Sequence, residues 1–181
     1  MKKLFYLVAV ISLILTMSCA HTGRLDSYAE DRAQIEDLQA RYLFALDSFD
    51  MDTYVETFTE DGILDIVEYQ VRGRDAIRKA LEESRPVFDL SAGDIPEGSY
   101  PATGRHNITN IVIEVDGNKA YSRSYWFHYG NDNPERKAVL DAYGHYEDDL
   151  VKINGKWFFK KRVIYNEGVK GWISPPGNRA W

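Results

Sequence analysis

Residues 138–165 read AVLDAYGHYEDDLVKINGKWFFKKRVIY, and this stretch contains the strongest hairpin signal in the chain. Asn154-Gly155 is typical of a two-residue β-turn, because both residue types tolerate the positive φ that such a turn requires. The segments on either side, 138–153 and 156–165, have the length and composition of strands, with an irregular apolar alternation at Lys161. The stretch therefore predicts a long antiparallel hairpin.

A second hairpin is expected just before the first. Asp116-Gly117-Asn118 is a good turn sequence, and it separates two strand-like segments at 106–115 and 119–129. The apolar face of the first segment changes between Ile108 and Ile111, which predicts a β-bulge at that point. The C-terminal half of the chain thus predicts two consecutive hairpins of one antiparallel sheet.

Three helices and one strand are expected in the N-terminal half. From Asp31 onward apolar side chains recur every three or four residues, which predicts an amphipathic helix. Asp52 is placed to cap a second, short helix; a strand follows at 63–71, a third helix at 74–83 and a loop at 84–104. Helices that precede antiparallel strands predict an α+β fold, with three helices packed on one face of a curved, mostly antiparallel sheet.

The composition narrows the classes of function. The chain has 181 residues, 44% of them hydrophobic, which suffices for one globular domain with a sizeable core. Its formal charge of −6, with no basic stripe, argues against a nucleic-acid partner. The chain lacks the sequence signatures of phosphate-binding loops, zinc sites and serine nucleophiles. No metal and no cofactor are therefore expected.

The first twenty residues have the pattern of a secretory signal peptide. A basic start precedes the apolar run 4–17, which would span only about 21 Å as a helix and is too short to cross a membrane. The run ends in Ser18-Cys19-Ala20. A general signal peptidase would free a soluble protein that begins at His21; alternatively, Cys19 becomes the lipid-modified first residue of a bacterial lipoprotein.

We favour the lipoprotein, because the single cysteine of the chain lies where lipidation requires it, although Thr16 departs from the usual leucine of the lipobox. The expected organisation is a signal peptide at 1–20, a tether at 21–29, one domain at 30–167 and a C-terminal tail at 168–181. The protein is expected to be exported, either periplasmic or held at a membrane by this anchor alone.

A few polar side chains stand in otherwise apolar stretches. Asp47 lies near the end of the first expected helix, and His106 opens a strand after the loop 84–104, where the rim of a pocket is expected. Each also has a structural interpretation: Asp47 fits a cap of the following turn or a partner of Arg41, and His106 and His128 fit hydrogen-bonded structural histidines.

Several stretches resemble the SnoaL-like family of the nuclear transport factor 2-like superfamily. They are DRAQIEDL at 31–38, RY at 41–42, ALD at 45–47, FTEDG at 58–62, GRDAI at 73–77, RHNITN at 105–110, GHY at 144–146, DLVK at 149–152 and GKW at 155–157. The resemblance covers about residues 30–167 and implies a cone-shaped α+β fold. Within the superfamily the chain is similar to hexachlorocyclohexane dehydrochlorinase, scytalone dehydratase and bile-acid 7α-dehydratase.

This resemblance also implies an active site. It places Asp47 and His106 as a catalytic dyad in which the carboxylate orients the imidazole for proton removal from carbon, with Tyr42 and His128 assisting. Three more polar residues are candidate substrate contacts: Tyr69, Asn110 and Tyr143.

The implied function is that of a cofactor-independent lyase, of dehydratase type, or an isomerase that acts on a hydrophobic ring compound such as a steroid or polyketide. The alternative is a non-catalytic lipoprotein that binds a small molecule in the same pocket, and the third is a structural role. The expected aromatic sheet face is a candidate surface for homo-oligomerisation through Tyr121, Tyr125, Phe127 and Tyr129.

Overall fold

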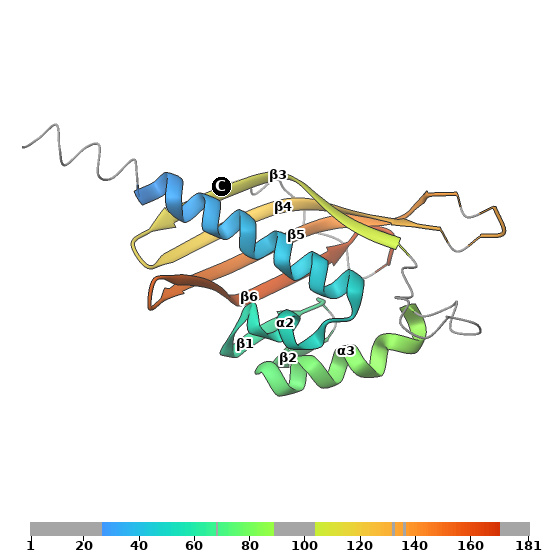
Figure 1. The fold of residues 1–181 in the computed structure, drawn as a ribbon, viewed down its shortest axis with the longest axis horizontal. Coiled ribbons are helices and arrows are strands. Elements are labelled where there is room, and N and C mark those ends of the chain that lie inside the picture. The colour runs from blue at the N-terminus through green and yellow to red at the C-terminus, as the bar shows by residue number, and fades with distance from the viewer. Residues whose placement is uncertain (1–26, 68, 89–103, 132, 136, 171–181) are drawn as a thin grey trace, which may run out of the picture.

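The computed structural model describes residues 27–67, 69–88, 104–131, 133–135 and 137–170. The first helix covers residues 27–48, and it is followed along the chain by α2 (Met51–Glu56), β1 (Phe58–Asp65), β2 (Gln70–Arg72), α3 (Arg74–Phe88), β3 (Gly104–Asp116), β4 (Lys119–Gly130), β5 (Val139–Ile153) and β6 (Lys156–Asn166). The expected α+β class is confirmed. The strands form one curved sheet, and the first helix crosses one of its faces (Figure 1).

The sheet has the strand order β2-β1-β6-β5-β4-β3. Both predicted hairpins are present, as β3–β4 and β5–β6, and each of these strand pairs is antiparallel. The β4–β5 and β1–β2 pairs are also antiparallel, whereas β1 runs parallel to β6. This parallel pair joins the N-terminal half of the chain to its last strand.

The two predicted irregularities of the strands are β-bulges. The register of β3 shifts between Thr109 and Val112, where Asn110 has a left-handed φ of 53°. In the β5–β6 pair, Leu150 pairs with Phe159, whereas the residue before it, Asp149, pairs with Lys161. One residue of β6 is thereby skipped, which accounts for the broken alternation in the sequence.

Two local predictions in the N-terminal half are wrong. The single strand expected at 63–71 is split into β1 and β2, because the chain turns at Val67, which has a φ of 66° and donates its N–H to the Asp65 carboxylate at 2.9 Å. The cap of α2 is Asp50, whose Oδ1 accepts the Thr53 N–H at 3.1 Å. Asp52 instead contacts Arg78 on α3 at 2.5 Å.

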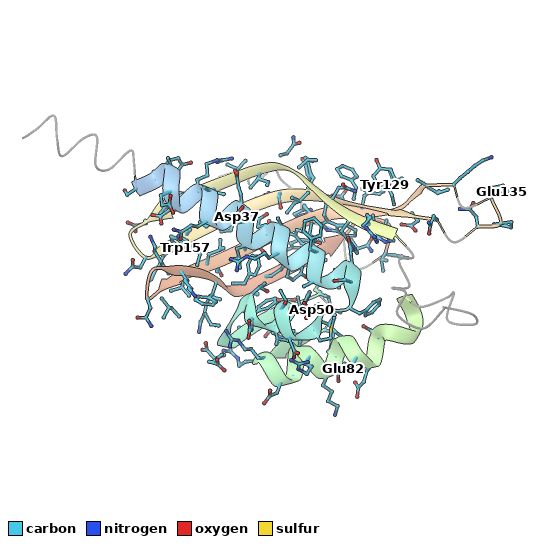
Figure 2. All side chains as sticks on the ribbon, viewed as in Figure 1. Asp37, Asp50, Glu82, Tyr129, Glu135 and Trp157 are labelled. Atoms are coloured by element: carbon cyan, nitrogen blue, oxygen red, sulfur yellow. The ribbon has the colours of Figure 1, made fainter. Side chains whose placement is uncertain are left out.

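The N-terminal end of the first helix is attached to the β5–β6 hairpin. Buried Asp31 accepts hydrogen bonds from the indole Nε1 of Trp157, which is labelled in Figure 2, at 2.9 Å and from Nζ of Lys152 at 2.5 Å. The Tyr28 hydroxyl and the Arg32 guanidinium also reach backbone carbonyls of β3. These bonds fix the helix along the sheet, so the position of its far end, which carries Asp47, is set as well.

The core between helix and sheet contains a buried ion pair. Arg162 on β6 donates from Nε and Nη2 to the Asp148 carboxylate on β5, at 2.7 and 2.8 Å, and both side chains have no exposed surface. Its guanidinium lies 4.0–4.2 Å from the ring centroids of Tyr42, Tyr146 and Phe159. Burial alone would lower the pKa of Arg162, but the Asp148 carboxylate outweighs it and raises this pKa.

The expected signal peptide and Cys19 lie outside the described residues, and so do most of the loop 84–104 and of the C-terminal tail. The first helix includes residues 27–29, which lie within the segment expected as a tether. Among the described helices, none is long and apolar enough to cross a membrane. Tyr125 and Tyr129 are 47% and 44% exposed, and self-association through the aromatic sheet face stays a prediction.

Candidate functional site

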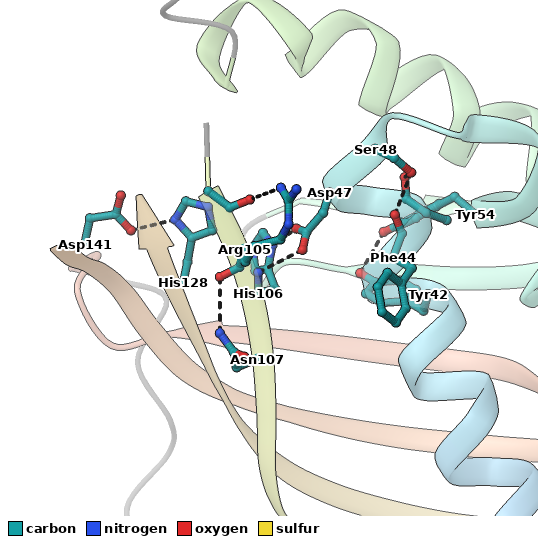
Figure 3. Close-up of polar contacts among 12 residues, drawn as sticks. Tyr42, Phe44, Asp47, Ser48, Tyr54, Arg105, His106, Asn107, His128 and Asp141 are labelled. Atoms are coloured by element: carbon teal, nitrogen blue, oxygen red, sulfur yellow. Dashed lines mark hydrogen bonds and ion pairs between the residues drawn. The ribbon is translucent and has the colours of Figure 1, made fainter. Parts of the chain in front are cut away.

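The end of the first helix and the start of β3 bring Asp47 and His106 into contact (Figure 3). One carboxylate oxygen, Oδ1, lies 2.6 Å from Nδ1 of the His106 ring, and the other, Oδ2, accepts the His106 backbone N–H at 3.0 Å. The two side chains are only 9% and 18% exposed. Arg41 donates instead to the Asp37 carbonyl, so the alternative prediction that Asp47 pairs with Arg41 is wrong.

This two-point contact has a chemical consequence. Because both oxygens of Asp47 accept N–H groups of His106, the proton of the neutral ring is held on Nδ1 and the lone pair is left on Nε2. The carboxylate would also stabilise the imidazolium that forms when Nε2 takes up a proton. The arrangement is therefore chemically suited to accept a proton at Nε2 of His106.

A second histidine lies directly across the β3–β4 ladder. His128 is the register partner of His106, and the two ring centroids are 4.5 Å apart. Nδ1 of His128 lies 2.6 Å from Oδ1 of Asp141 on β5 (Figure 3). The site thus contains two Asp–His pairs side by side. Asp47, His106 and His128 were candidate site residues in the sequence, whereas Asp141 was missed.

An aromatic side chain borders the paired histidines. Trp126, two residues before His128 on β4, lies 6.0 Å from the His106 ring and is 4% exposed. It stacks on Tyr146 at 5.9 Å and donates from Nε1 to the Tyr165 carbonyl at 3.1 Å. Trp126 is therefore a fixed, buried apolar side chain beside the dyad, and this position was not predicted from the sequence.

Tyr42, predicted to assist the dyad, lies in the core. Its side chain has no exposed surface, and its hydroxyl accepts the Tyr54 hydroxyl at 2.7 Å. Burial raises the pKa of Tyr42, opposed by the nearby Arg162 guanidinium. Figure 3 shows Tyr42 and Tyr54 beside the dyad, and no hydrogen bond is drawn from either tyrosine to Asp47 or His106. The position of Tyr42 supports a packing role more directly than a proton-transfer role.

The three candidate substrate contacts are not brought together. Tyr69 lies between β1 and β2, at the opposite edge of the sheet from β3, and is 54% exposed. Tyr143 pairs with Phe127, so its side chain is on the face of the sheet opposite to that of His128. Asn110 occupies the β3 bulge, four residues and therefore about 13 Å along the strand from His106.

The described residues also form a surface hollow, but they do not form a group of metal-binding side chains. A surface hollow between α2 and α3 is lined by Phe49, Asp50, Met51, Asp52, Arg78 and Glu82. Within the described part of the chain, no three His, Cys, Asp or Glu side chains are grouped so that they could hold a metal ion.

A third histidine, His145 on β5, gives a pH-dependent prediction for stability. The side chain is 1% exposed and stacks on Tyr165 at 4.4 Å. Burial lowers the pKa of His145 below 6.5 and Arg123 lowers it further, whereas Glu167 opposes the shift. As pH falls below about 6.5, the unfolded chain therefore takes up this proton before the folded protein does, and stability declines.

We expect the free energy of unfolding to fall more between neutral and acid pH in the wild type than in His145→Gln. Denaturant unfolding at a series of pH values measures this difference, because the two proteins are identical at every other position. Parallel pH profiles for the two proteins would contradict the assignment.

Many solved structures are similar to this chain, and three of them illustrate the likeness. A protein of unknown function from Mycobacterium tuberculosis is 26% identical, with a TM-score of 0.66, over 79% of this chain and 75% of that one. A candidate scytalone dehydratase from Novosphingobium aromaticivorans is 26% identical, with a TM-score of 0.62, over 78% and 87%. A nuclear transport factor 2-like protein with a cystatin-like fold from the same organism is 21% identical, with a TM-score of 0.65, over 82% and 90%.

No curated protein matches this chain in sequence. The model of the SnoaL-like domain matches residues 27–163, which include both Asp–His pairs. The structural neighbours with nuclear transport factor 2-like and cystatin-like folds agree with this match. The chain belongs to the SnoaL-like domain family.

Proposed function

We propose that this protein is a cofactor-independent lyase or isomerase in which His106, oriented by Asp47, removes a proton from a carbon atom of the substrate. The observation that carries the proposal is the two-point contact between the Asp47 carboxylate and His106, with both side chains largely buried. A carboxylate that served only as a helix cap or a surface charge would not need to hold a histidine ring in one tautomer.

In the proposed reaction, Nε2 of His106 takes the proton and the electron pair of the C–H bond remains on the substrate. In a dehydratase this pair forms a C=C bond while a hydroxyl group leaves; in an isomerase it forms an enolate that is reprotonated at another carbon. His128 lies 4.5 Å from His106 and is placed to donate a proton to the leaving oxygen or to the enolate. General acid–base catalysis of this kind contributes about 10²- to 10⁴-fold.

The proposed substrate is a hydrophobic ring compound that carries a carbonyl or hydroxyl group. The apolar ring of Trp126, 6.0 Å from the His106 ring, supports an apolar substrate ring. Likeness to a candidate scytalone dehydratase supports elimination of water as the reaction. Steroid- and polyketide-like compounds combine these features.

The test is turnover of a panel of cyclic hydroxyketones, followed by mass spectrometry. Dehydration lowers the mass of a compound by that of one water, and isomerisation changes its retention time at constant mass. We expect turnover by the wild type but none by His106→Gln. The control is Asn107→Ala, which changes the exposed side chain next to His106 in the sequence and should leave turnover unchanged. Binding of a compound without conversion, equally tight in His106→Gln, would instead support a non-catalytic binding protein.

We further propose that the domain is exported and held at a membrane surface by a lipid on Cys19. In Cys19→Ala, we expect palmitate labelling to disappear and the protein to move from the membrane fraction to the soluble fraction, since one acylated residue is the whole anchor. Label that persists in this variant would overturn the anchor, as would wild-type protein that is wholly soluble and begins at His21.

A further inference from the structure

We propose that Asp141 is a positioning residue that orients His128 as the second proton-transfer group of the site. The inference rests on the proposed function, because it assigns the residue that prepares the proton donor of that reaction. Asp141 acts through His128, whose Nδ1 lies 2.6 Å from its carboxylate. His128 is the group expected to touch the substrate.

A β-bulge brings Asp141 to this position. His128 on β4 pairs with Ala142, but the next residue, Tyr129, pairs with Leu140, so Asp141 is the extra residue of β5. In a regular strand Asp141 would point to the face opposite to that of its neighbour Ala142, and hence away from His128. Bulges redirect side chains in this way. The extra residue thus places the carboxylate beside the ring.

Gly104 provides room for the ring of His128. A Cβ atom on Gly104 would lie 2.3 Å from Nε2 and 2.6 Å from Cε1 of His128, so any larger residue would displace the ring. Gly104 and His106 are two residues apart on β3 and face the same side of the sheet. The ring of His128 is therefore bounded by Gly104, by His106 and by Asp141, and it is held in one orientation.

The contact with Asp141 determines what His128 can do. When Nδ1–H is donated to the carboxylate, Nε2 is an acceptor in the neutral ring and a donor in the imidazolium. His128 is 21% exposed, and its Nε2 has no hydrogen-bond partner among the described residues. The two Asp–His pairs therefore offer one nitrogen each to a substrate.

The two nitrogens suffice for a balanced elimination. Neutral His106 accepts the proton from carbon at Nε2, the C–H electron pair forms the C=C bond, and the C–O bond breaks. Protonated His128 donates its Nε2 proton to the departing hydroxyl, which leaves as water. The sum of charges on the two rings is unchanged, and exchange with solvent returns the proton from His106 to His128.

The test combines a tautomer measurement with kinetics. The ¹⁵N spectrum of histidine-labelled protein at alkaline pH distinguishes a proton on Nδ1 from one on Nε2, and His128→Gln assigns the signal. In the wild type we expect the His128 proton on Nδ1. In Asp141→Ala we expect it to move to Nε2 in a large share of molecules, while His106, held by Asp47, keeps its tautomer. Asp141→Glu should restore part of the wild-type population.

We also expect Asp141→Ala to lower kcat about 10- to 100-fold with little change in KM. This loss is smaller than that expected for removing a general acid outright, because His128 itself is retained. Asp149→Ala, which removes an exposed carboxylate from the same strand, is the matched control and should change neither measurement. An unchanged His128 tautomer in Asp141→Ala would overturn the proposal, and so would a changed tautomer with wild-type kcat. The tautomer measurement needs no substrate, so failure of the proposed function would be recognised separately.

Discussion

Asp47→Asn is expected to reduce kcat/KM by about 10²- to 10⁴-fold while leaving the fold intact. The Asp47 carboxylate offers one oxygen to the His106 backbone N–H and the other to Nδ1. An asparagine has a single oxygen, so its NH₂ group must face one of these two donors. If the NH₂ faces Nδ1, the ring proton moves to Nε2, and the lone pair that would accept the substrate proton is lost.

The matched control is Asp37→Asn, which removes a carboxylate from the exposed side of the same helix (Figure 2). Turnover of a converted panel compound should be unchanged in this control. Circular dichroism and thermal unfolding check that both variants are folded. Activity of Asp47→Asn within a few fold of wild type would contradict the role assigned to the carboxylate.

Arg162→Met is expected to lower the free energy of unfolding by about 3–5 kcal/mol. The substitution leaves the Asp148 carboxylate buried without its cation and with Ser122 as a hydrogen-bond donor at 2.9 Å. It also removes the guanidinium from among the three aromatic rings, contacts that contribute most when they are desolvated. Equilibrium unfolding in denaturant measures the loss.

Lys161→Met is the control, because Lys161 is the neighbour of Arg162 and forms a partly exposed ion pair with Asp65 at 2.8 Å. We expect it to cost less than about 1 kcal/mol. In the double variant Arg162→Met, Asp148→Leu no buried charge is left unpaired, and much of the loss should be recovered. A single variant as stable as the Lys161 control would show that the buried pair is not important for stability.

The C-terminal half of the fold could be predicted from the sequence, because its signals are local. Asn154 and Gly155 have φ values of 50° and 79° in the structure, as their residue types suggest for such a turn. The N-terminal half was less predictable. The turn at Val67 is held by the Val67 N–H, which donates to the Asp65 carboxylate, and a positive φ is not expected for a β-branched residue such as valine.

The candidate site was only partly predictable for the same reason. Asp47 and His106 could be placed through their resemblance to a family pattern, but Asp141 depends on a bulge in β5 that no residue type in the sequence indicates. Tyr42 matched the pattern as well, yet its hydroxyl faces Tyr54 inside the core. Which polar residues of a curved sheet meet is decided by register, and register is set by contacts between distant strands.

Exchange of carbon-bound hydrogen with solvent tests the central claim, that His106 removes a proton from carbon. Each panel compound is incubated in D₂O with wild-type protein or with His106→Gln, and deuterium on carbon is measured by mass spectrometry against a protein-free sample. We predict that the wild type incorporates deuterium into an isomerised compound, or removes a carbon-bound hydrogen in forming a dehydrated one, and that His106→Gln does neither above background. Equal incorporation or equal dehydration above background by the two proteins would contradict the account.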